Sequence, residues 1–383
     1  FGQNGHKLIS SAADYYDRPV VSTEIYGAFK DIDYKFDSLM LYRPMFEMFT
    51  RGVNFVIPHG MWYNPELVYI SPLVSPYNKE IAPALPAYSD FVGRSCLLLQ
   101  GGRRISEIGV MYPFEELAGH FVFDNPDGIR QGFYISPETD YQEISGILSN
   151  DIRRDFTFIH PEFFLEDKYQ IENGTVKLNN IENFQEYKVM FLTGCKTVSW
   201  KALQKLKAFY ESGGTIISTT QLPFKSSEMG EDQKVVDLVN EIFGLNPIQT
   251  DSANIQTNSN SKGGYAVFIP QPNKSNIQKV LDERIEADVA FEPNPVLKSD
   301  FGKFNYIHKI KDGKNIYMFT NSSDEKIETE VLLRGKLKME VCDPHSGNTS
   351  VLKRLPVEGK DGQLFTKCKL ELNPVSSVFW IDE

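Results

Sequence analysis

The sequence is that of an acidic globular chain of 383 residues, of which 41% are hydrophobic and 24% charged. Its 40 basic and 51 acidic residues give a net charge of −11, which argues against a nucleic-acid scaffold. No stretch reaches the roughly 18 uncharged apolar residues of a membrane helix, and the length predicts two or three domains. The chain begins at Phe1 rather than methionine, so we expect a processed product or a fragment of a longer protein.

The first region, residues 1–104, is rich in proline, tyrosine and methionine. The predicted elements, in chain order, are a helix at 6–16, a strand at 19–23, a helix at 45–51, a strand at 53–57 and a helix at 88–100. Both strands are apolar without alternation and follow helices, which is typical of a parallel sheet covered on both faces. We therefore expect two buried parallel strands in this region.

The second region, residues 105–292, alternates strands with helices. Strands are predicted at 108–112, 156–159, 189–192, 215–219 and 265–269, and helices at 141–150, 199–213, 232–243 and 277–285. In the clearest helix, Ser199 is the expected N-cap and Gly213 the expected end. The alternation predicts a doubly wound α/β domain, flavodoxin-like or amidotransferase-like in outline. The polar run 251–264 predicts a mobile surface loop.

The third region, residues 293–383, has the pattern of an all-β domain. Strands are predicted at 306–309, 316–320, 328–333 and 377–381, with turn residues between them. Short strands at regular spacing indicate a β-sandwich.

The strongest candidate site lies where the two strands of the first region end. Glu24 follows one strand, and His59, Trp62 and Tyr63 follow the other, which also contains Asn54. The carboxyl edge of parallel strands is where barrel enzymes carry their catalytic groups. A carboxylate, an imidazole, an amide and stacking aromatic rings together suit a sugar ring, because the carboxylate can move a proton while the rings cover the apolar sugar face.

A structural alternative exists for the two groups most important to this site. Glu24 could instead form an ion pair with Arg18 or Arg43, and His59 could be a core histidine with satisfied hydrogen bonds. Sequence spacing leaves both interpretations open.

Other polar signals favour structural roles. The run 155–162 holds a histidine and carboxylates at a strand end, but its spacing matches no standard metal motif and indicates a turn. Cys195 follows a strand and a glycine without a partner histidine at a recognisable distance, so we expect a structural thiol. Cys96, Cys342 and Cys368 show no CxxC spacing, and buried free thiols are expected, with a Cys342–Cys368 disulfide as the alternative.

Three segments carry a resemblance to a known family. The runs STEIYG (22–27), GVNFVIPHGMWY (52–63) and SPLVSPYNKEIAPALPAYSDFVGRSCLLLQGG (71–102) resemble the last two strands of a glycoside hydrolase barrel. The chain is most similar to family 106, the α-L-rhamnosidases and their relatives in gut Bacteroidetes, which degrade complex polysaccharides. The resemblance implies the C-terminal part of a (β/α)8 barrel at 1–104, a flavodoxin-like domain at 105–292 and a β-sandwich at 293–383.

The resemblance also implies an inverting reaction between two carboxylates. Glu24 is then the candidate general base, and the candidate sugar contacts are His59, Trp62, Tyr63, Asn54 and Tyr26. The implied partner is a carbohydrate substrate, with neither nucleic acid nor a membrane span, and the α/β domain is expected to serve packing or homo-oligomerisation. The implied setting is the periplasm, the cell envelope or the outside of the cell. No cofactor is certain, although calcium is a candidate without an assignable set of ligands.

The chain departs from the family in its length. A complete barrel takes about 250 residues in eight strand–helix units, and only two such units are predicted here. The strand that should carry the acid partner of Glu24 is therefore missing, and we expect the isolated chain to be catalytically silent. Two alternatives remain: a β-galactosidase-like retaining enzyme with Glu24 as nucleophile, and a non-catalytic carbohydrate-binding or oligomerisation module.

Overall fold

The computed structural model describes residues 5–27, 37–61, 63–64, 66–67, 74–120, 135–136, 138–249, 253–299, 301–358 and 363–382. The chain forms two compact units. The α/β unit consists of Phe1–Ser11 with Ser106–Glu286, and the β-rich unit consists of Ala12–Ile105 with Ala287–Glu383. Within the described ranges, no helix has the length and apolar character needed to cross a membrane.

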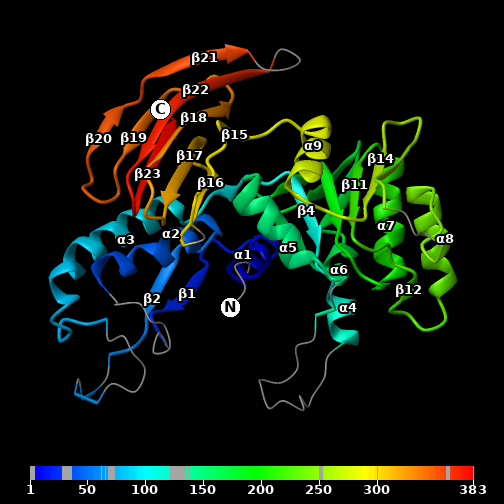
Figure 1. Ribbon diagram of the computed structural model, residues 1–383, viewed down its shortest axis with the longest axis horizontal. Coiled ribbons are helices and arrows are strands. Elements are labelled where there is room, and N and C mark those ends of the chain that lie inside the picture. The colour runs from blue at the N-terminus through cyan, green and yellow to red at the C-terminus, as the bar shows by residue number, and fades with distance from the viewer. Residues whose placement is uncertain are drawn as a thin grey trace. The chain divides into compact units, whose positions relative to one another are not determined.

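The α/β unit is built around a mostly parallel sheet (Figure 1). In the described chain its strand order is β13 (Gln256–Ser259), β14 (Tyr265–Ile269), β11 (Thr215–Thr219), β9 (Val189–Leu192), β4 (Ile108–Met111) and β5 (Thr157–Ile159). All neighbours are parallel except β13, which pairs antiparallel with β14. Continuous apolar runs in the inner strands agree with burial on both faces.

Helices and small sheets complete this unit. The helices are α1 (Gly5–Tyr15, which continues into the other unit), α4 (Phe114–Gly119), α5 (Tyr141–Gly146, continued by a π-helical turn at Ile147–Asp151), α6 (Pro161–Phe164), α7 (Trp200–Glu211), α8 (Asp232–Phe243) and α9 (Lys274–Arg284). The small sheets are β6 (Tyr169–Glu172), β7 (Thr175–Leu178) and β8 (Gln185–Tyr187), and the pair β10 (Thr197–Val198) and β12 (Lys225–Ser226). Strands β4 and β11 lie between α5 and α7 (Figure 1).

The helix that the sequence predicts most clearly has the predicted ends. The Ser199 side chain accepts a hydrogen bond from the Ala202 backbone N–H at 3.3 Å, so it caps α7 as expected. Beyond the helix, Gly213 has a φ of 108°, which favours glycine. At Gly214 a Cβ would lie 2.2 Å from the Phe209 ring, so the chain can turn back toward β11 only without a side chain.

The predicted loop at 251–264 is partly wrong. Residues 256–259 form β13, and the hairpin to β14 closes at 260–264, where the Asn260 side chain accepts from the Lys262 and Gly264 backbone N–H groups. All four side chains of β13 are polar, and the strand pairs with β14 on one side only. A half-exposed edge strand does not need alternating apolar side chains to be stable. Because this segment lacks such alternation, its polar composition predicted a loop.

The β-rich unit contains two antiparallel sheets and a helical layer. Its N-terminal elements are β1 (Ser22–Ile25), a 3₁₀ turn at Ser38–Leu41, α2 (Arg43–Thr50), β2 (Phe55–Pro58), a 3₁₀ turn at Ala82–Ala84, α3 (Leu85–Leu99) and β3 (Arg103–Arg104). One sheet has the order β15 (Val289–Glu292), β18 (Ile327–Arg334), β22 (Leu364–Leu372) and β21 (Arg354–Glu358). The other has the order β20 (Thr349–Val351), β19 (Met339–Cys342), β23 (Ser376–Asp382), β17 (Lys314–Asn321), β16 (Phe304–Lys311) and β3.

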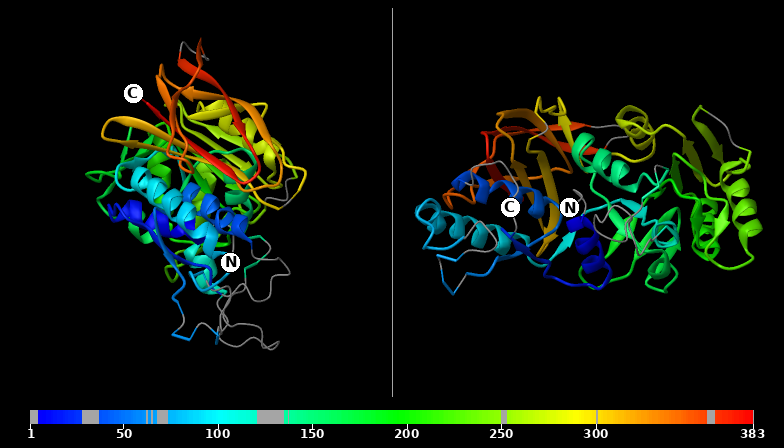
Figure 2. Two further views of the ribbon diagram at one scale, coloured as in Figure 1. Left: turned by 90° about the vertical axis from the view of Figure 1, so that its left-hand side faces the viewer. Right: turned by 60° about the horizontal axis from the view of Figure 1, so that its bottom comes forward.

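Successive side chains along the inner strands of this second sheet point to opposite faces, and each face packs against a different hydrophobic core. On β17, Tyr317 and Phe319 join a core shared with the first sheet, whereas Met318 joins a core shared with the helices. Phe46 of α2 and Phe91 of α3 belong to that helical core. Figure 2 shows these blue and cyan helices along one face of the orange and red strands.

The contacts therefore differ from the three-part division that the sequence predicts at 1–104, 105–292 and 293–383. Residues 12–105 and 287–383 form one unit because the helices of the first segment cover a face of the sheet of the last segment. The pairing of β3 with β16 adds a strand from the first segment to that sheet. Such long-range packing leaves no mark in local composition.

Candidate active site

Strands β1 and β2 form a parallel pair, as the sequence predicts. The register places Glu24 opposite Ile57 and Ile25 opposite Pro58. Just beyond, the His59 backbone N–H donates to the Ile25 carbonyl at 2.7 Å. The carboxyl ends of both strands thus lie side by side, which brings Glu24 and His59 together.

The Glu24 carboxylate and the His59 imidazole are in direct contact. Glu24 Oε1 lies 2.7 Å from His59 Nδ1, and 63% of the Glu24 side chain is exposed against 24% of His59. Gly27 leaves room for the ring, since a Cβ at this position would lie 3.3 Å from His59 Nδ1. An exposed pair of this kind contributes little to stability, so its geometry orients the carboxylate rather than holding the fold together.

The alternative ion pair between Glu24 and Arg43 does not form. Arg43 donates instead to the Asp324 carboxylate at 2.5 Å and to the Ser322 carbonyl. His59 is half-exposed at the strand end rather than enclosed in the core. Both observations leave the Glu24 carboxylate facing solvent with an imidazole beside it.

Two of the predicted sugar contacts lie behind this edge. Asn54 is buried and bridges strands, because its Oδ1 accepts from the Val21 N–H at 2.8 Å and its Nδ2 donates to the Pro19 carbonyl at 2.9 Å. Tyr26 is buried as well, with its hydroxyl 2.6 Å from the Tyr88 hydroxyl. Burial raises the pKa of Tyr26 well above its usual value. Both side chains fix the positions of the strands.

The strands themselves are more exposed than the sequence predicts. Of the side chains on β2, Phe55 is 44% and Ile57 48% exposed, and Tyr63 beyond the strand is fully exposed. Trp62 lies outside the described residues. The reason is topological, since in the described chain this sheet has two strands, and no further strand pairs with them. The expectation of two buried strands is therefore wrong for this chain.

The structure assigns no set of ligands to a metal ion among the described residues. Among them, no group of three or more histidine, cysteine, aspartate or glutamate side chains could hold one. The run 155–162 instead contains β5 and the start of α6, where His160 Nδ1 accepts from the Glu162 N–H at 3.3 Å and caps the helix. The local hydrogen bond that was predicted is present, but the predicted turn is wrong. A calcium ion stays an untested prediction, and no step below depends on it.

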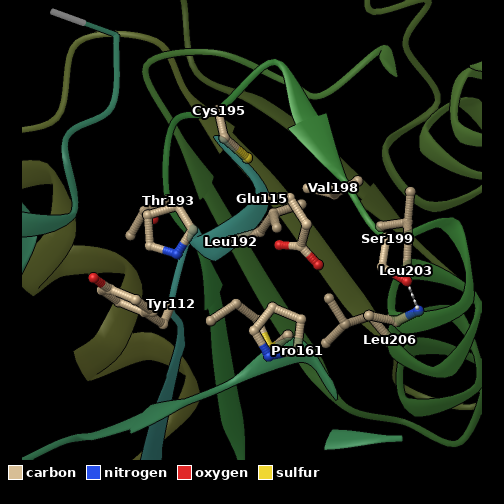
Figure 3. Close-up of a pocket in the computed structure, with 13 residues that line it drawn as sticks. Tyr112, Glu115, Pro161, Leu192, Thr193, Cys195, Val198, Ser199, Leu203 and Leu206 are labelled. Atoms are coloured by element: carbon tan, nitrogen blue, oxygen red, sulfur yellow. Dashed lines mark hydrogen bonds between the residues drawn. The ribbon is translucent and has the colours of Figure 1, made fainter. Parts of the chain in front are cut away.

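A pocket opens at the carboxyl edge of the sheet in the α/β unit (Figure 3). The empty space among its lining residues is about 340 Å³, a volume that includes open solvent, and it lies beside the ends of β4 and β9. Glu115 points into it, and burial raises the pKa of Glu115 to about 7, with Glu228 and Glu162 adding to the effect. Sequence reasoning missed Glu115, because nothing in its spacing marks a buried carboxyl group.

Cys195 also lines this pocket and is buried, and a structural role for this thiol stays a prediction. Burial raises the pKa of Cys195 well above its usual value, and Glu116, Glu115 and Asp140 raise it further. The Glu116 carboxylate also accepts hydrogen bonds from the backbone N–H groups of Lys196 and Thr197, in the loop after Cys195. All four cysteines are free, so the Cys342–Cys368 disulfide does not form.

Glu115→Gln should change the pH dependence of stability of the α/β unit. The ordinary pKa of 4.5 applies to Glu115 in the unfolded chain, and about 7 applies in the folded one. Between these values the folded state keeps a proton that the unfolded state loses, so wild-type stability falls as pH rises. Relative to wild type, the variant should gain about 1–3 kcal/mol from pH 5 to pH 8. Urea unfolding of both proteins at pH 5 and pH 8, monitored by hydrogen exchange in α7, measures this gain. A difference in unfolding free energy between variant and wild type that is the same at both pH values would contradict the prediction.

Comparisons with known proteins place the chain in a family. The family model described as alpha-L-rhamnosidase, glycoside hydrolase family 106, matches residues 3–353. A search of curated proteins found no match.

Three solved structures share the fold at low sequence identity. A rhamnosidase from Novosphingobium sp. PP1Y is 17% identical with a TM-score of 0.69, over 99% of this chain and 33% of its own. A beta-galactosidase from Bacillus circulans sp. alkalophilus is 10% identical with a TM-score of 0.62, over 97% of this chain and 57% of its own. An alpha-L-fucosidase isoenzyme 2 from Paenibacillus thiaminolyticus is 11% identical with a TM-score of 0.56, over 99% and 63%.

The chain thus spans 33% of the length of the rhamnosidase that it resembles and 57% of the beta-galactosidase. At these identities the likeness concerns the fold. The family model, in contrast, covers most of the sequence. The chain belongs to glycoside hydrolase family 106, the alpha-L-rhamnosidase family.

Proposed function

We propose that this chain is the C-terminal portion of a glycosidase that hydrolyses α-L-rhamnosides or related glycosides of complex polysaccharides, with Glu24 as the general base. The observation that carries this proposal is the contact between Glu24 and His59 at the carboxyl ends of two parallel strands. Membership of family 106 supports the reaction class. The exposed carboxylate supports a role in chemistry, since the fold gains little from it.

In the proposed reaction Glu24 removes a proton from the attacking water while a second carboxylic acid protonates the leaving oxygen. Inverting enzymes hold these two carboxyl groups roughly 6.5–9.5 Å apart, with the water and the sugar ring between them. His59 keeps the Glu24 carboxylate in one orientation through the contact of 2.7 Å with Nδ1. A fixed orientation matters because misplacing a reacting group by about 1 Å can lower the rate by about 10²-fold.

We further propose that β1 and β2 are strands of a (β/α)8 barrel, followed by a flavodoxin-like domain and a β-sandwich. Phe55 and Ile57 support this, because apolar side chains this exposed on a two-stranded parallel sheet suit burial beneath further elements. The strands that cover them would carry the acid partner. The proposed setting is the periplasm, the cell envelope or the outside of the cell, and homo-oligomerisation remains a prediction.

The substrate is proposed to lie over the strand ends. Tyr63, which is fully exposed, and Trp62 would stack against the sugar, and His59 would contact its hydroxyls. We propose Asn54 and Tyr26 as positioning residues, because their polar groups are already used between strands.

His59→Ala should lower kcat on the order of ten- to a hundred-fold with a smaller change in KM, because the carboxylate loses its orienting partner. His59→Asn should recover most of this loss, since the asparagine amide can donate from the place of Nδ1. Steady-state kinetics of the full-length gene product measure both values. If KM rises while kcat stays constant in both variants, His59 acts in substrate binding alone and does not position the base.

The substrate class is tested by assaying the full-length gene product on aryl α-L-rhamnosides and aryl β-D-galactosides. Hydrolysis of the rhamnoside with a kcat/KM well above that for the galactoside is expected. Preference for the galactoside would support the β-galactosidase-like alternative, and failure to act on either would support a non-catalytic module.

A further inference from the structure

The pocket of the α/β unit combines an apolar wall with a single carboxylate. Its wall comes from the ends of β4 and β9, from β10 and from α7, including Val198, Leu203 and Leu206. Figure 3 shows the Glu115 carboxylate in the middle of these side chains. The backbone of Ser199 acts to stabilise the charged form of Glu115. An apolar pocket with few convergent polar groups is the usual form of a small-ligand site.

Other carboxylates lie near Glu115. Glu162 in α6 and Glu228 before α8 both act on it electrostatically, and each destabilises its charged form. The Cys195 thiol lies in the same wall and stays protonated. Glu116 and Asp140 lie near that thiol, and both accept hydrogen bonds from backbone N–H groups of the loop after β9. This potential repels anions and attracts cations.

A second polar group in the wall is unused. Thr193 follows β9, is 1% exposed and lines the pocket. Its hydroxyl oxygen has no hydrogen-bond partner in the described structure. A buried hydroxyl without a partner is unfavourable, so a ligand that hydrogen-bonds to it gains affinity. The hydroxyl therefore points to a ligand independently of the carboxylates.

We propose that this pocket binds a small primary amine with an apolar body, its ammonium group on Glu115 and Thr193 and its body against Val198, Leu203 and Leu206. The ammonium supplies a positive charge beside the carboxylates. Its N–H groups can donate hydrogen bonds to a Glu115 carboxylate oxygen and to the Thr193 hydroxyl oxygen. The short apolar chain of the ligand replaces water against Val198, Leu203 and Leu206. The site is separate from the Glu24–His59 edge and does not depend on the proposed glycosidase activity.

The test uses n-butylammonium and its neutral analogue n-butanol on the chain with ¹³C-labelled leucine methyl groups. Only ionised Glu115 attracts the ammonium, and its pKa of about 7 makes it mostly protonated at pH 6 and mostly ionised at pH 8. Butylammonium should therefore bind about ten-fold tighter at pH 8 than at pH 6, as seen in the methyl shifts of Leu192, Leu203 and Leu206. Butanol should bind more weakly than butylammonium at pH 8, and its affinity should not increase from pH 6 to pH 8.

Two variants and a control complete the experiment. Glu115→Gln should remove both the tight binding and its pH dependence, and Thr193→Val should weaken binding at both pH values. Glu143→Gln, on the exposed side of α5, should bind as wild type does. The proposal is overturned if butanol binds as tightly as butylammonium, if binding strengthens toward pH 6, or if Glu115→Gln binds like the control.

Discussion

Glu24→Gln should lower the kcat of the full-length enzyme on an α-L-rhamnoside by roughly 10²–10⁴-fold, the usual contribution of a general base. Glutamine keeps the size and one carbonyl oxygen of glutamate, so it can still accept from His59 but cannot take a proton from water. KM should change little, because the contacts to the sugar remain. The variant should fold normally, since 63% of the Glu24 side chain is exposed and its pair with His59 adds little stability.

Glu340→Gln is the matched control, since it removes an exposed carboxylate from the same unit, on β19 of a different sheet. Its kcat should equal that of the wild type. Steady-state kinetics on an aryl α-L-rhamnoside measure both variants. Wild-type turnover by Glu24→Gln would remove Glu24 from the catalytic site.

Phe91→Ala should destabilise the β-rich unit by about 3–5 kcal/mol, the usual cost of removing a buried phenylalanine. Phe91 is completely buried in α3 and stacks on His345 with ring centroids 4.7 Å apart. Burial lowers the pKa of His345, which favours the neutral ring in this stack. Arg94, one turn further along α3, donates to the Pro344 and His345 carbonyls. The substitution therefore opens a cavity where the first and last segments of the unit meet.

Hydrogen exchange with mass spectrometry distinguishes this unit from its neighbour. Peptides from 12–105 and from 287–383 should lose protection together in Phe91→Ala, whereas those from 106–286 should keep it. Leu97→Ala is the control on the same helix, because this side chain is 70% exposed and its loss should change stability by at most about 0.5 kcal/mol. Loss of protection confined to 12–105 would show that the two segments fold separately.

Local pattern predicts the secondary structure of the α/β unit well. Helix α8 and strand β14 have the predicted bounds, since each is an apolar run or stripe with its own end signals. Ser199 marks the start of α7 for the same reason. Helix α9 begins at Lys274, earlier than predicted, because Asn273 and Asn276 form a capping box that the apolar pattern does not show.

Tertiary contacts were predicted less well. Phe46 and Phe91 show the periodicity of buried helix faces, but nothing local says that their partners are Met318 and Phe379 at the other end of the chain. At the candidate site, sequence reasoning brought Glu24 and His59 together correctly because parallel strands end at one edge. It could not separate Asn54, whose amide is used between strands, from the groups that face solvent.

The most direct test of Glu24 as the base of an inverting glycosidase is the configuration of the sugar first released. Time-resolved proton NMR of the full-length enzyme with an aryl α-L-rhamnoside should show β-L-rhamnose first, followed by slow mutarotation, because water attacks the face opposite the leaving group. If α-L-rhamnose appears first, the enzyme retains configuration. Glu24 would then act as a nucleophile or lie outside the reaction, and the proposed mechanism would be wrong.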